Sequence, residues 1–334
     1  MTSPKVSVCI PVYNGSPYIA EAVGSVLAQT YGNFELLICD NCSTDDTKDI
    51  VCTFKDQRIQ YVRNTRNLGL VGNANRCLGL AKGEYICIFH HDDVMLPDNL
   101  ERKIALLDEN ARVGLVHSNI MLIDTEGKIV SQNIWNKDST RDYIEEGSAV
   151  FKKFLEYLPF GSSIFIGAVM ARRSCYDRLG GFSPELIHCN DSEMWMRMML
   201  HYDVACIADP LVKYRVHPIS TSSSWGNYTS LPYLREHYHA ARMIFDNYGE
   251  NMLHANVLLR QVSLSFARRA LRLSRNKFGH GDFAEGKAFL KESIHFSSKI
   301  IKELTFWITL TKFLIRPSGV RFCQAIKKHI GYTA

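Results

Sequence analysis

Short apolar runs alternate with helix-like segments over the start of the chain. The runs are rich in β-branched and aromatic residues, which predicts buried strands at 6–12, 34–39, 58–62 and 85–89. Apolar side chains recur at helical spacing between these runs, which predicts helices at 17–27, 44–54 and 73–81. The alternation predicts an α/β protein with a largely parallel sheet that is covered by helices on both faces.

The pattern is less regular after the fourth strand. Strand-like segments follow at 113–118, 165–171 and 204–207, and a helix-like segment lies at 191–202. From residue 231 onward the pattern is helical almost throughout, including a helical hairpin with a glycine-rich turn at 276–282. We therefore expect an α/β domain over residues 1–225 and a mainly helical C-terminal extension over residues 226–334.

Polar clusters stand where three of the predicted strands end. Tyr13-Asn14 follows the first strand, Asp40-Asn41 follows the second, and the residues from His90 to Asp93 follow the fourth. In open α/β sheets, ligands bind beyond the carboxyl ends of the strands. The sequence therefore predicts a nucleotide-sized site that contains carboxylates.

Each candidate residue has a structural interpretation beside the functional one. Asp92 and Asp93 are either ligands of a divalent ion or part of a solvated turn in which an aspartate caps a helix. Mg²⁺ or Mn²⁺ matches such oxygen ligands best. Asp40 suits the acceptor of a nucleobase N–H or a helix N-cap. Asp191 precedes an amphipathic helix and suits a general base or simple capping. His217 suits a metal ligand or a phosphate contact, although most single histidines are neither.

The composition is that of a soluble globular protein, with 334 residues of which 46% are apolar and 22% charged. It excludes collagen-like, coiled-coil, fully disordered and disulfide-framework proteins. The ten cysteines are spread through apolar segments, which suits a reducing cytosol. Cys39-x-x-Cys42 has no partner pair, which argues against zinc, and the N-terminus lacks a signal-peptide pattern. We therefore expect a cytoplasmic protein.

Charge is distributed unevenly along the chain. Residues 251–334 contain 15 lysines and arginines and 4 acidic residues, a net charge of +11. Residues 1–250 contain 24 lysines and arginines and 30 acidic residues, a net charge of −6. The basic tail indicates an anionic partner, which charge alone allows to be a membrane surface, a nucleic acid or a lipid phosphate. No nucleic-acid motif is recognisable, so we expect no nucleic acid. No apolar run reaches the ~18 residues that cross a bilayer.

A set of motifs follows in a characteristic order along the chain. The motifs lie at 8–14, 40–45, 67–69, 81–86, 92–98, 180–182, 190–195 and 214–218. Together they resemble those of family 2 glycosyltransferases, over roughly residues 4–222. The resemblance implies the GT-A fold, an α/β sandwich that binds a nucleotide-sugar donor. It also implies Mg²⁺ or Mn²⁺ as the usual cofactor and transfer of the sugar with inversion at the anomeric carbon.

The resemblance implies roles for individual residues. The implied donor-binding residues are Pro11, Tyr13, Asn14, Asp40, Arg66, Asn67, His91 and Asp92. Asp40 is implied to accept the nucleobase N–H. The implied metal ligands are Asp92, Asp93 and His217, and Asp191 is implied as the base that deprotonates the acceptor hydroxyl.

The chain departs from the family pattern at informative positions. The usual first Asp of the Asp-x-Asp signature falls on His90, and the usual Glu before Asp191 is Asn190. The first change affects a ribose or metal contact and leaves metal dependence open. The Gln-x-x-Arg-Trp motif of processive synthases is missing, because Arg197 is followed by Met198. We therefore expect one sugar to be added per encounter.

Our leading hypothesis is a cytosolic, inverting glycosyltransferase that moves one sugar from a UDP- or dTDP-sugar to a saccharide or lipid-linked acceptor in cell-surface polysaccharide synthesis. The basic C-terminal region has two interpretations. It docks on the inner face of the membrane, with Phe306 and Trp307 at the interface, or it packs as a helical cap on the catalytic domain.

Two alternative functions stay open at this stage. A nucleotidyltransferase shares nucleotide and metal chemistry, but it predicts a glycine-rich phosphate loop with Lys or Arg where this chain has Tyr13-Asn14-Gly15. A catalytically inactive nucleotide-sugar-binding protein is motivated by His90 and Asn190. It predicts donor binding without donor turnover.

Overall fold

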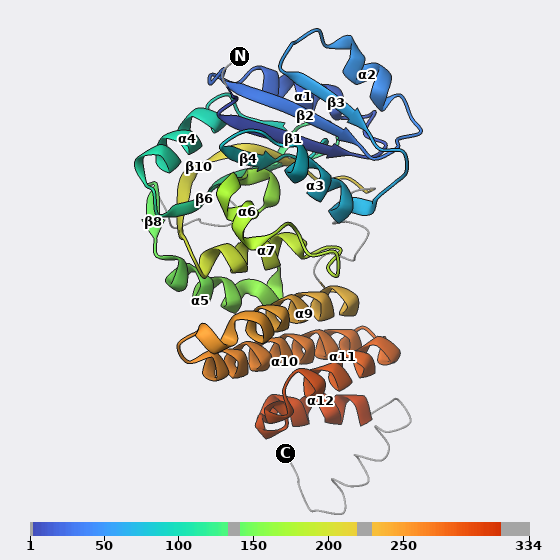
Figure 1. The fold of residues 1–334 in the computed structure, drawn as a ribbon. Coiled ribbons are helices and arrows are strands. Elements are labelled where there is room, and N and C mark those ends of the chain that lie inside the picture. The colour runs from blue at the N-terminus through green and yellow to red at the C-terminus, as the bar shows by residue number, and fades with distance from the viewer. Residues whose placement is uncertain (1–2, 133–140, 219–228, 315–334) are drawn as a thin grey trace, which may run out of the picture. The chain divides into compact units, whose positions relative to one another are not determined.

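A mixed β-sheet with helices on its two faces organises the first of two compact units (Figure 1). The structure is a computed structural model that describes residues 3–132, 141–218 and 229–314. Within these residues, the first unit contains 3–154 and 162–218, and the second contains 155–161 and 229–314. The predicted α/β fold class with a helical C-terminal region is confirmed.

Among the described residues, the first unit contains the ten strands and the helices α1 to α7, although the last three residues of α5 belong to the second unit. Its strands are β1 (Val6–Val12), β2 (Phe34–Asp40), β3 (Ile59–Arg63), β4 (Tyr85–Ile88), β5 (Val94–Met95), β6 (Val113–Ile123), β7 (Ile129–Gln132), β8 (Tyr143–Glu145), β9 (Val169–Arg172) and β10 (Asp203–Arg215). Its helices are α1 (Ile19–Leu27), α2 (Thr47–Thr53), α3 (Gly69–Leu80), α4 (Asn99–Glu109), α5 (Gly147–Tyr157), α6 (Arg173–Leu179) and α7 (Asn190–Met199), with the short helix η2 (Ile166–Ala168).

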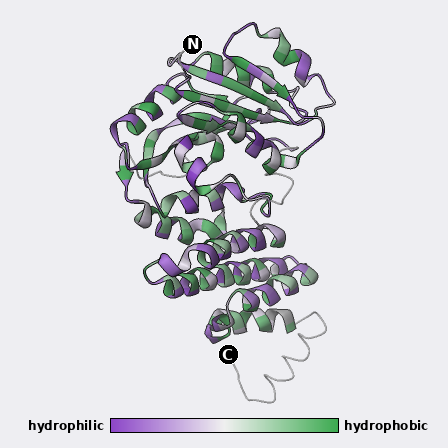
Figure 2. Ribbon diagram, in the orientation of Figure 1, coloured by the Kyte–Doolittle hydropathy of each residue, from purple (hydrophilic) through white to green (hydrophobic). Residues whose placement is uncertain are grey.

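The sheet order is β3-β2-β1-β4-β9-β6-β10-β5, with β7 beside β6 and β8 beside β10. The first four strands in this order are parallel, as the sequence pattern predicts. β9 runs antiparallel to both of its neighbours, β4 and β6, and so joins the parallel part to the rest of the sheet. All seven residues of β1 are buried, because helices cover both faces of this central strand (Figure 2).

Two predicted segments differ from the structure for physical reasons. The segment 165–171 begins as η2 and becomes a strand only at Val169. β10 continues through Pro210, where the sequence pattern indicates a break. Its register against β6 shifts on both sides of that proline, so the missing N–H falls at an irregularity where no ladder bond is needed.

The second unit is helical. It contains η1 (Leu158–Phe160), α9 (Leu231–Tyr248), η3 (Gly249–Asn251), α10 (Ala255–Gly279), α11 (Phe283–Phe296), η4 (Ser298–Lys302) and α12 (Leu304–Leu314). α10 and α11 form the predicted helical hairpin. The two helices pack closely at Gly286, where an added Cβ would lie 2.4 Å from the ring of Phe278. None of the helices within the described residues has the length and apolar character that a membrane span requires.

A lysine is buried on the apolar face of α4. Lys103 is fully buried beside Leu100, Ile104 and Leu107, and its ammonium has no hydrogen-bond partner among the described residues. Burial lowers the pKa of Lys103 to about 8. The folded state therefore binds this proton less tightly than the unfolded state does, which lowers stability whenever the amine is charged.

Replacing this lysine should stabilise the protein. We expect Lys103→Met to raise the free energy of unfolding by about 2–3 kcal/mol near neutral pH, measured by urea denaturation. The folded pKa lies below the unfolded one, so the stability of the parent chain should rise as the pH increases above about 8, and the variant should lose that rise. Lys153→Met, at an exposed lysine on α5, is the control and should change stability by less than about 0.5 kcal/mol. Equal effects of the two substitutions would contradict the prediction.

Candidate functional site

The polar segments after β1, β2 and β4 meet at one edge of the sheet. β1 is paired in parallel with both β2 and β4, so the three carboxyl ends lie side by side. The Asn14 amide donates to the hydroxyl of Ser43 at 2.9 Å, and the Asn14 side chain accepts from the Thr44 amide at 2.8 Å. The predicted convergence of the first two strand ends is therefore present in the structure.

The loop after β4 packs on the loop after β1. A Cβ added to Gly15 would lie 2.7 Å from Cδ2 of His91 and 2.5 Å from Cγ2 of Val12. Only glycine fits at this position, because the imidazole occupies the space that a side chain would need. Tyr13, at the tip of the first loop, is 46% exposed and free to contact a ligand, whereas Pro11 is buried within β1.

Asp40 is fully buried at the end of β2. One carboxylate oxygen accepts from the Ser43 amide at 2.7 Å, and the other accepts from the hydroxyl of Tyr61 and from Arg63 at 3.2 Å. A nucleobase N–H reaches this carboxylate only if Tyr61 or Arg63 moves, so the role of Asp40 in binding the base stays a prediction. Sequence reasoning missed Tyr61 and Arg63, although both lie on β3 opposite the end of β2.

Asparagine side chains hold the loop that carries Arg66 and Asn67. The Asn41 amide donates to the Asn67 side chain at 2.8 Å, and Asn64 donates to Asn41 at 3.0 Å and to Asn73 at 2.9 Å. This chain of amides fixes the loop against the end of β2 and leaves Arg66 exposed to solvent. The predicted contacts of Arg66 and Asn67 with a nucleotide stay predictions.

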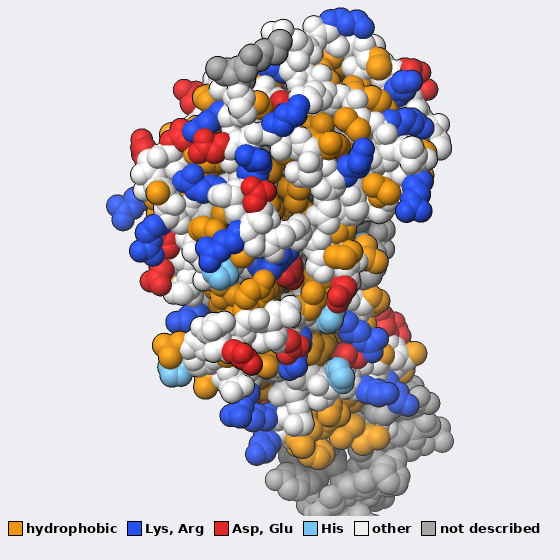
Figure 3. Space-filling model, in the orientation of Figure 1, with side chains coloured by type: hydrophobic (Ala, Val, Ile, Leu, Met, Phe, Trp, Pro, Cys, Tyr) orange, Lys and Arg blue, Asp and Glu red, His pale blue; other side chains and the backbone are white. Residues whose placement is uncertain are grey.

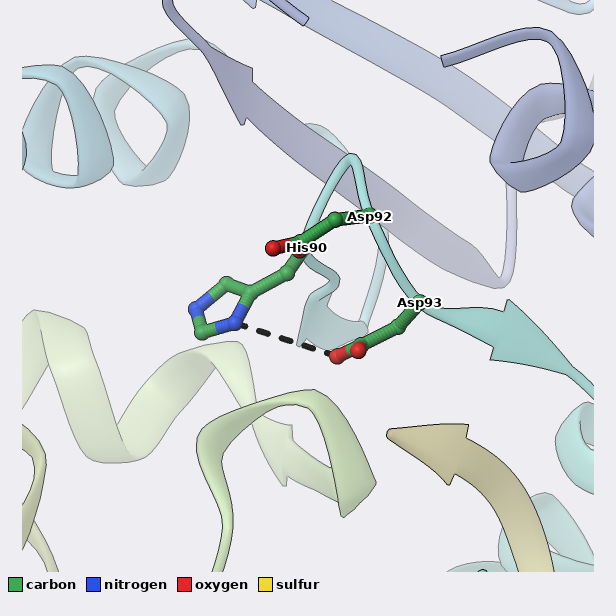
Figure 4. A group of neighbouring side chains, drawn as sticks. All are labelled: His90, Asp92 and Asp93. Carbon is green, nitrogen blue, oxygen red and sulfur yellow. Dashed lines mark ion pairs between the residues drawn. The ribbon is translucent and has the colours of Figure 1, made fainter. Parts of the chain in front are cut away.

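The loop after β4 gathers three groups that can bind a metal ion (Figure 4). One ligand atom from each of His90, Asp92 and Asp93 lies within 4.8 Å of the others. Nδ1 of His90 lies 3.8 Å from the Oδ2 atom of Asp93. The sequence analysis named Asp92 and Asp93 as ligands but treated His90 only as a lost aspartate. The spacing of His90 two residues before Asp92 was the signal for a third ligand.

The two carboxyl groups of this cluster differ in their environment. Asp93 is 1% exposed, its Oδ1 accepts from the Arg215 amide at 2.9 Å, and its Oδ2 has no hydrogen-bond partner among the described residues. Burial, followed by the charge of Asp92, raises the pKa of Asp93 well above its usual range. Burial opposes ionisation of Asp92 too, but the neighbouring histidines outweigh it and lower the pKa of that carboxyl. A divalent cation would replace the proton on Asp93 and give its orphan oxygen a partner, so the residues present fit a metal ion.

His217 contacts the cluster from the end of β10. Its Nε2 lies 2.9 Å from Oδ2 of Asp92, and its ring lies 5.1 Å from that of Tyr18, between centroids. Its Nδ1 is buried without a hydrogen-bond partner among the described residues. The arrangement suits either a ligand of the ion or a group that orients Asp92, and the predicted ligand role stays a prediction.

Arg215 fixes the position of this loop. Its side chain is 1% exposed, and its Nε donates to the Asp92 carbonyl at 2.9 Å. The same guanidinium donates to the Asp124 carbonyl at 3.1 Å, pairs with Glu21 on α1, and lies 4.6 Å from the ring centroid of Tyr18. One side chain therefore ties the end of β10 to α1, to the turn after β6 and to the loop after β4.

Asp191 lies in the first turn of α7. Its carboxylate accepts from the amide and the hydroxyl of the next residue, Ser192, at 2.6 and 3.3 Å. Glu193, by contrast, is buried in an ion pair with Arg197 at 2.7 Å, which assigns it to packing. The role of Asp191 as a base stays a prediction.

Sequence comparison identifies relatives of this chain. The family model for glycosyl transferase family 2 matches residues 7–177. An uncharacterized protein from Mycobacterium tuberculosis is 30% identical over 229 residues, which cover 66% of this chain and 70% of that one. The Escherichia coli UDP-Glc:alpha-D-GlcNAc-diphosphoundecaprenol beta-1,3-glucosyltransferase WfgD is 28% identical over 221 residues, which cover 66% of this chain and 80% of WfgD.

Solved structures share the fold. TarS 1–349 from Staphylococcus aureus, in complex with UDP-GlcNAc, superposes with a TM-score of 0.64 over 87% of this chain and 81% of TarS, at 20% identity. The mannosyltransferase PcManGT from Pyrobaculum calidifontis, in complex with GDP-Man and Mn²⁺, gives a TM-score of 0.57 over 94% of this chain and 88% of that one, at 18% identity. The predicted GT-A fold is thereby confirmed, and the chain belongs to glycosyl transferase family 2.

Proposed function

We propose that this protein transfers one sugar per encounter, with inversion, from a nucleoside diphosphate sugar to a hydroxyl group of a saccharide or lipid-linked acceptor. The observation that carries the proposal is the cluster of His90, Asp92 and Asp93 beside the loops that follow β1 and β2. It puts candidate cation ligands next to a candidate nucleoside pocket at the carboxyl edge of the sheet, where α/β proteins bind such ligands.

We propose that the donor is a UDP- or dTDP-sugar. Tyr13 and Asn14 supply an exposed ring and a polar side chain at the edge of the pocket, and Arg66 supplies an exposed cation on the neighbouring loop. Asp40 would accept the N3–H of uracil or thymine once Arg63 has swung away, because Arg63 is the more exposed of its side-chain donors. TarS, with its UDP-GlcNAc complex, supports a uracil base.

We propose that His90, Asp92 and Asp93 hold a divalent cation, with His217 as a fourth group. When bound, the cation stabilises the negative charge that develops on the leaving diphosphate. An imidazole among the ligands favours Mn²⁺ over Mg²⁺, because Mg²⁺ is bound mainly by oxygen. The PcManGT complex contains Mn²⁺, which supports this choice.

We propose that Asp191 accepts the proton of the acceptor hydroxyl. A hydroxyl is a poor nucleophile, and a carboxylate within hydrogen-bond distance assists its attack on the anomeric carbon. Single inversion requires one attack on one face, so no second carboxylate is needed.

We assign donor binding and transfer to residues 1–225 and propose residues 226–334 as a separate basic region. WfgD is named for an acceptor with a diphosphoundecaprenol lipid, which supports a lipid-linked acceptor and a role in cell-surface polysaccharide synthesis. Such an acceptor would bring the enzyme to the inner face of the membrane from the cytoplasm, where the basic C-terminal region would contact anionic lipid.

The choice of donor and the role of Asp191 as the general base can be tested in one screen. We expect turnover with UDP- or dTDP-sugars in the presence of Mn²⁺ and little with GDP-sugars. Asp191→Asn should lower kcat by about 10²–10⁴-fold and leave donor affinity within about twofold, because it removes a proton acceptor and not a donor contact. Asp49→Asn, at an exposed aspartate on α2, is the control.

Full activity of Asp191→Asn would remove this residue as the base. Donor binding by the parent chain without turnover of any donor, with any acceptor extract, would instead favour an inactive nucleotide-sugar-binding protein. That outcome would trace to His90 and Asn190, the two departures from the family pattern.

The choice of metal can be tested by ligand exchange. We expect His90→Asp to shift the preference from Mn²⁺ toward Mg²⁺, because the cluster then contains only carboxylates. Asp92→Asn should weaken Mn²⁺ binding at least about tenfold, measured by electron paramagnetic resonance titration as well as by rate. His295→Asp, at an exposed histidine on α11, is the matched control and should leave both unchanged. An unaltered metal preference of His90→Asp would contradict the assignment of His90.

A further inference from the structure

The last described helix, α12, is apolar on two sides. Phe306 and Thr309 are buried where α12 packs on α10 and α11. On the other side, Leu304, Trp307 and Leu314 recur at helical spacing and are 75%, 53% and 62% exposed. The solvent side of a helix in a globular protein is normally polar or charged. The exposed side of α12 is therefore suited to a partner other than water.

The apolar surface extends from α12 onto η4. Ile301 and Ile308 are both exposed, and the indole N–H of Trp307 donates to the Ile301 carbonyl at 2.9 Å. This bond holds the indole against η4 while half of the side chain faces solvent. We call the surface the α12 face, and its residues are Ile301, Leu304, Trp307, Ile308 and Leu314.

Positive charge lies beside the α12 face. Lys299 and Lys302 are exposed on η4, at the start of the face. The nearby acid Glu303 is paired with Arg268 at 2.7 Å, so its charge is offset. Figure 3 shows hydrophobic side chains gathered in the region of α12, with lysine and arginine side chains at the margins. The surface thus combines an apolar centre with basic side chains at its margin.

We propose that the α12 face binds an anionic lipid bilayer, with α12 lying in the plane of the interface. Leucine, isoleucine and tryptophan side chains enter the boundary between headgroups and acyl chains, and lysines pair with anionic headgroups. A second copy of the chain fits less well, because a two-fold contact through this face would bring like charges together. α12 does not span the bilayer, since it is too short.

Membrane binding by the α12 face deepens the proposed function, and it depends on that function only through the proposed lipid-linked acceptor. A lipid-linked acceptor is confined to a membrane, so an enzyme held at the same surface meets it in two dimensions. The α12 face itself is defined by exposure and charge, independently of donor and metal. Membrane binding and sugar transfer can therefore fail separately in experiment.

The test is co-sedimentation of the full chain with lipid vesicles. We expect binding to phosphatidylglycerol-containing vesicles, weaker binding to pure phosphatidylcholine vesicles, and loss of the difference at high salt. Leu304→Asp combined with Trp307→Ala should weaken binding at least about tenfold, and Lys299→Gln with Lys302→Gln should weaken it mainly for anionic vesicles. Leu253→Asp is the matched control, because Leu253 is 81% exposed but lies outside η4 and α12.

Donor hydrolysis in the absence of vesicles separates the two proposals. It should be unchanged in all of these variants, which also shows that they are folded. Vesicle binding that survives Leu304→Asp with Trp307→Ala would overturn the inference. So would the absence of vesicle binding by the parent chain, or light scattering that shows a dimer which the same variant dissociates.

Discussion

The buried guanidinium of Arg215 is the interaction on which the geometry of the site depends. A charge that is 1% exposed is tolerable only when hydrogen bonds replace its hydration, and here carbonyls and one carboxylate do so. Because these acceptors belong to α1, the turn after β6 and the loop after β4, satisfying the charge brings the three segments together. The backbone amide of Arg215 adds a bond to Asp93, so both the main chain and the side chain of this residue act on the cluster.

The cluster is built so that its protein partners alone leave it incomplete. Asp93 has one oxygen that accepts from backbone and one without a hydrogen-bond partner among the described residues. Burial opposes ionisation of its neighbour Asp92, but the surrounding histidines lower the pKa of that carboxyl. Negative charge on one of these carboxyl groups disfavours ionisation of the other, and a bound cation would offset that repulsion.

The sequence predicted the parallel strands and the meeting of their ends because both follow from local pattern and a general rule of sheet geometry. It did not predict that Asp40 is enclosed by Tyr61 and Arg63, since that contact depends on the register between β2 and β3. The continuation of β10 through Pro210 depends in the same way on a bulge. The sequence around Asp191 does not show whether this residue serves as a base. An aspartate at the start of a helix suits either capping or catalysis, and only the tertiary structure separates the two.

The contact between Gly15 and His91 couples the loop after β1 to the loop after β4. There is no space for even a methyl group between the loop after β1 and the loop after β4, so a displacement of His91 toward Gly15 would have to move the first loop as well. If a nucleoside and a cation bind to these two loops, as proposed, the binding of each would affect the affinity for the other, and this linkage would be equal in both directions.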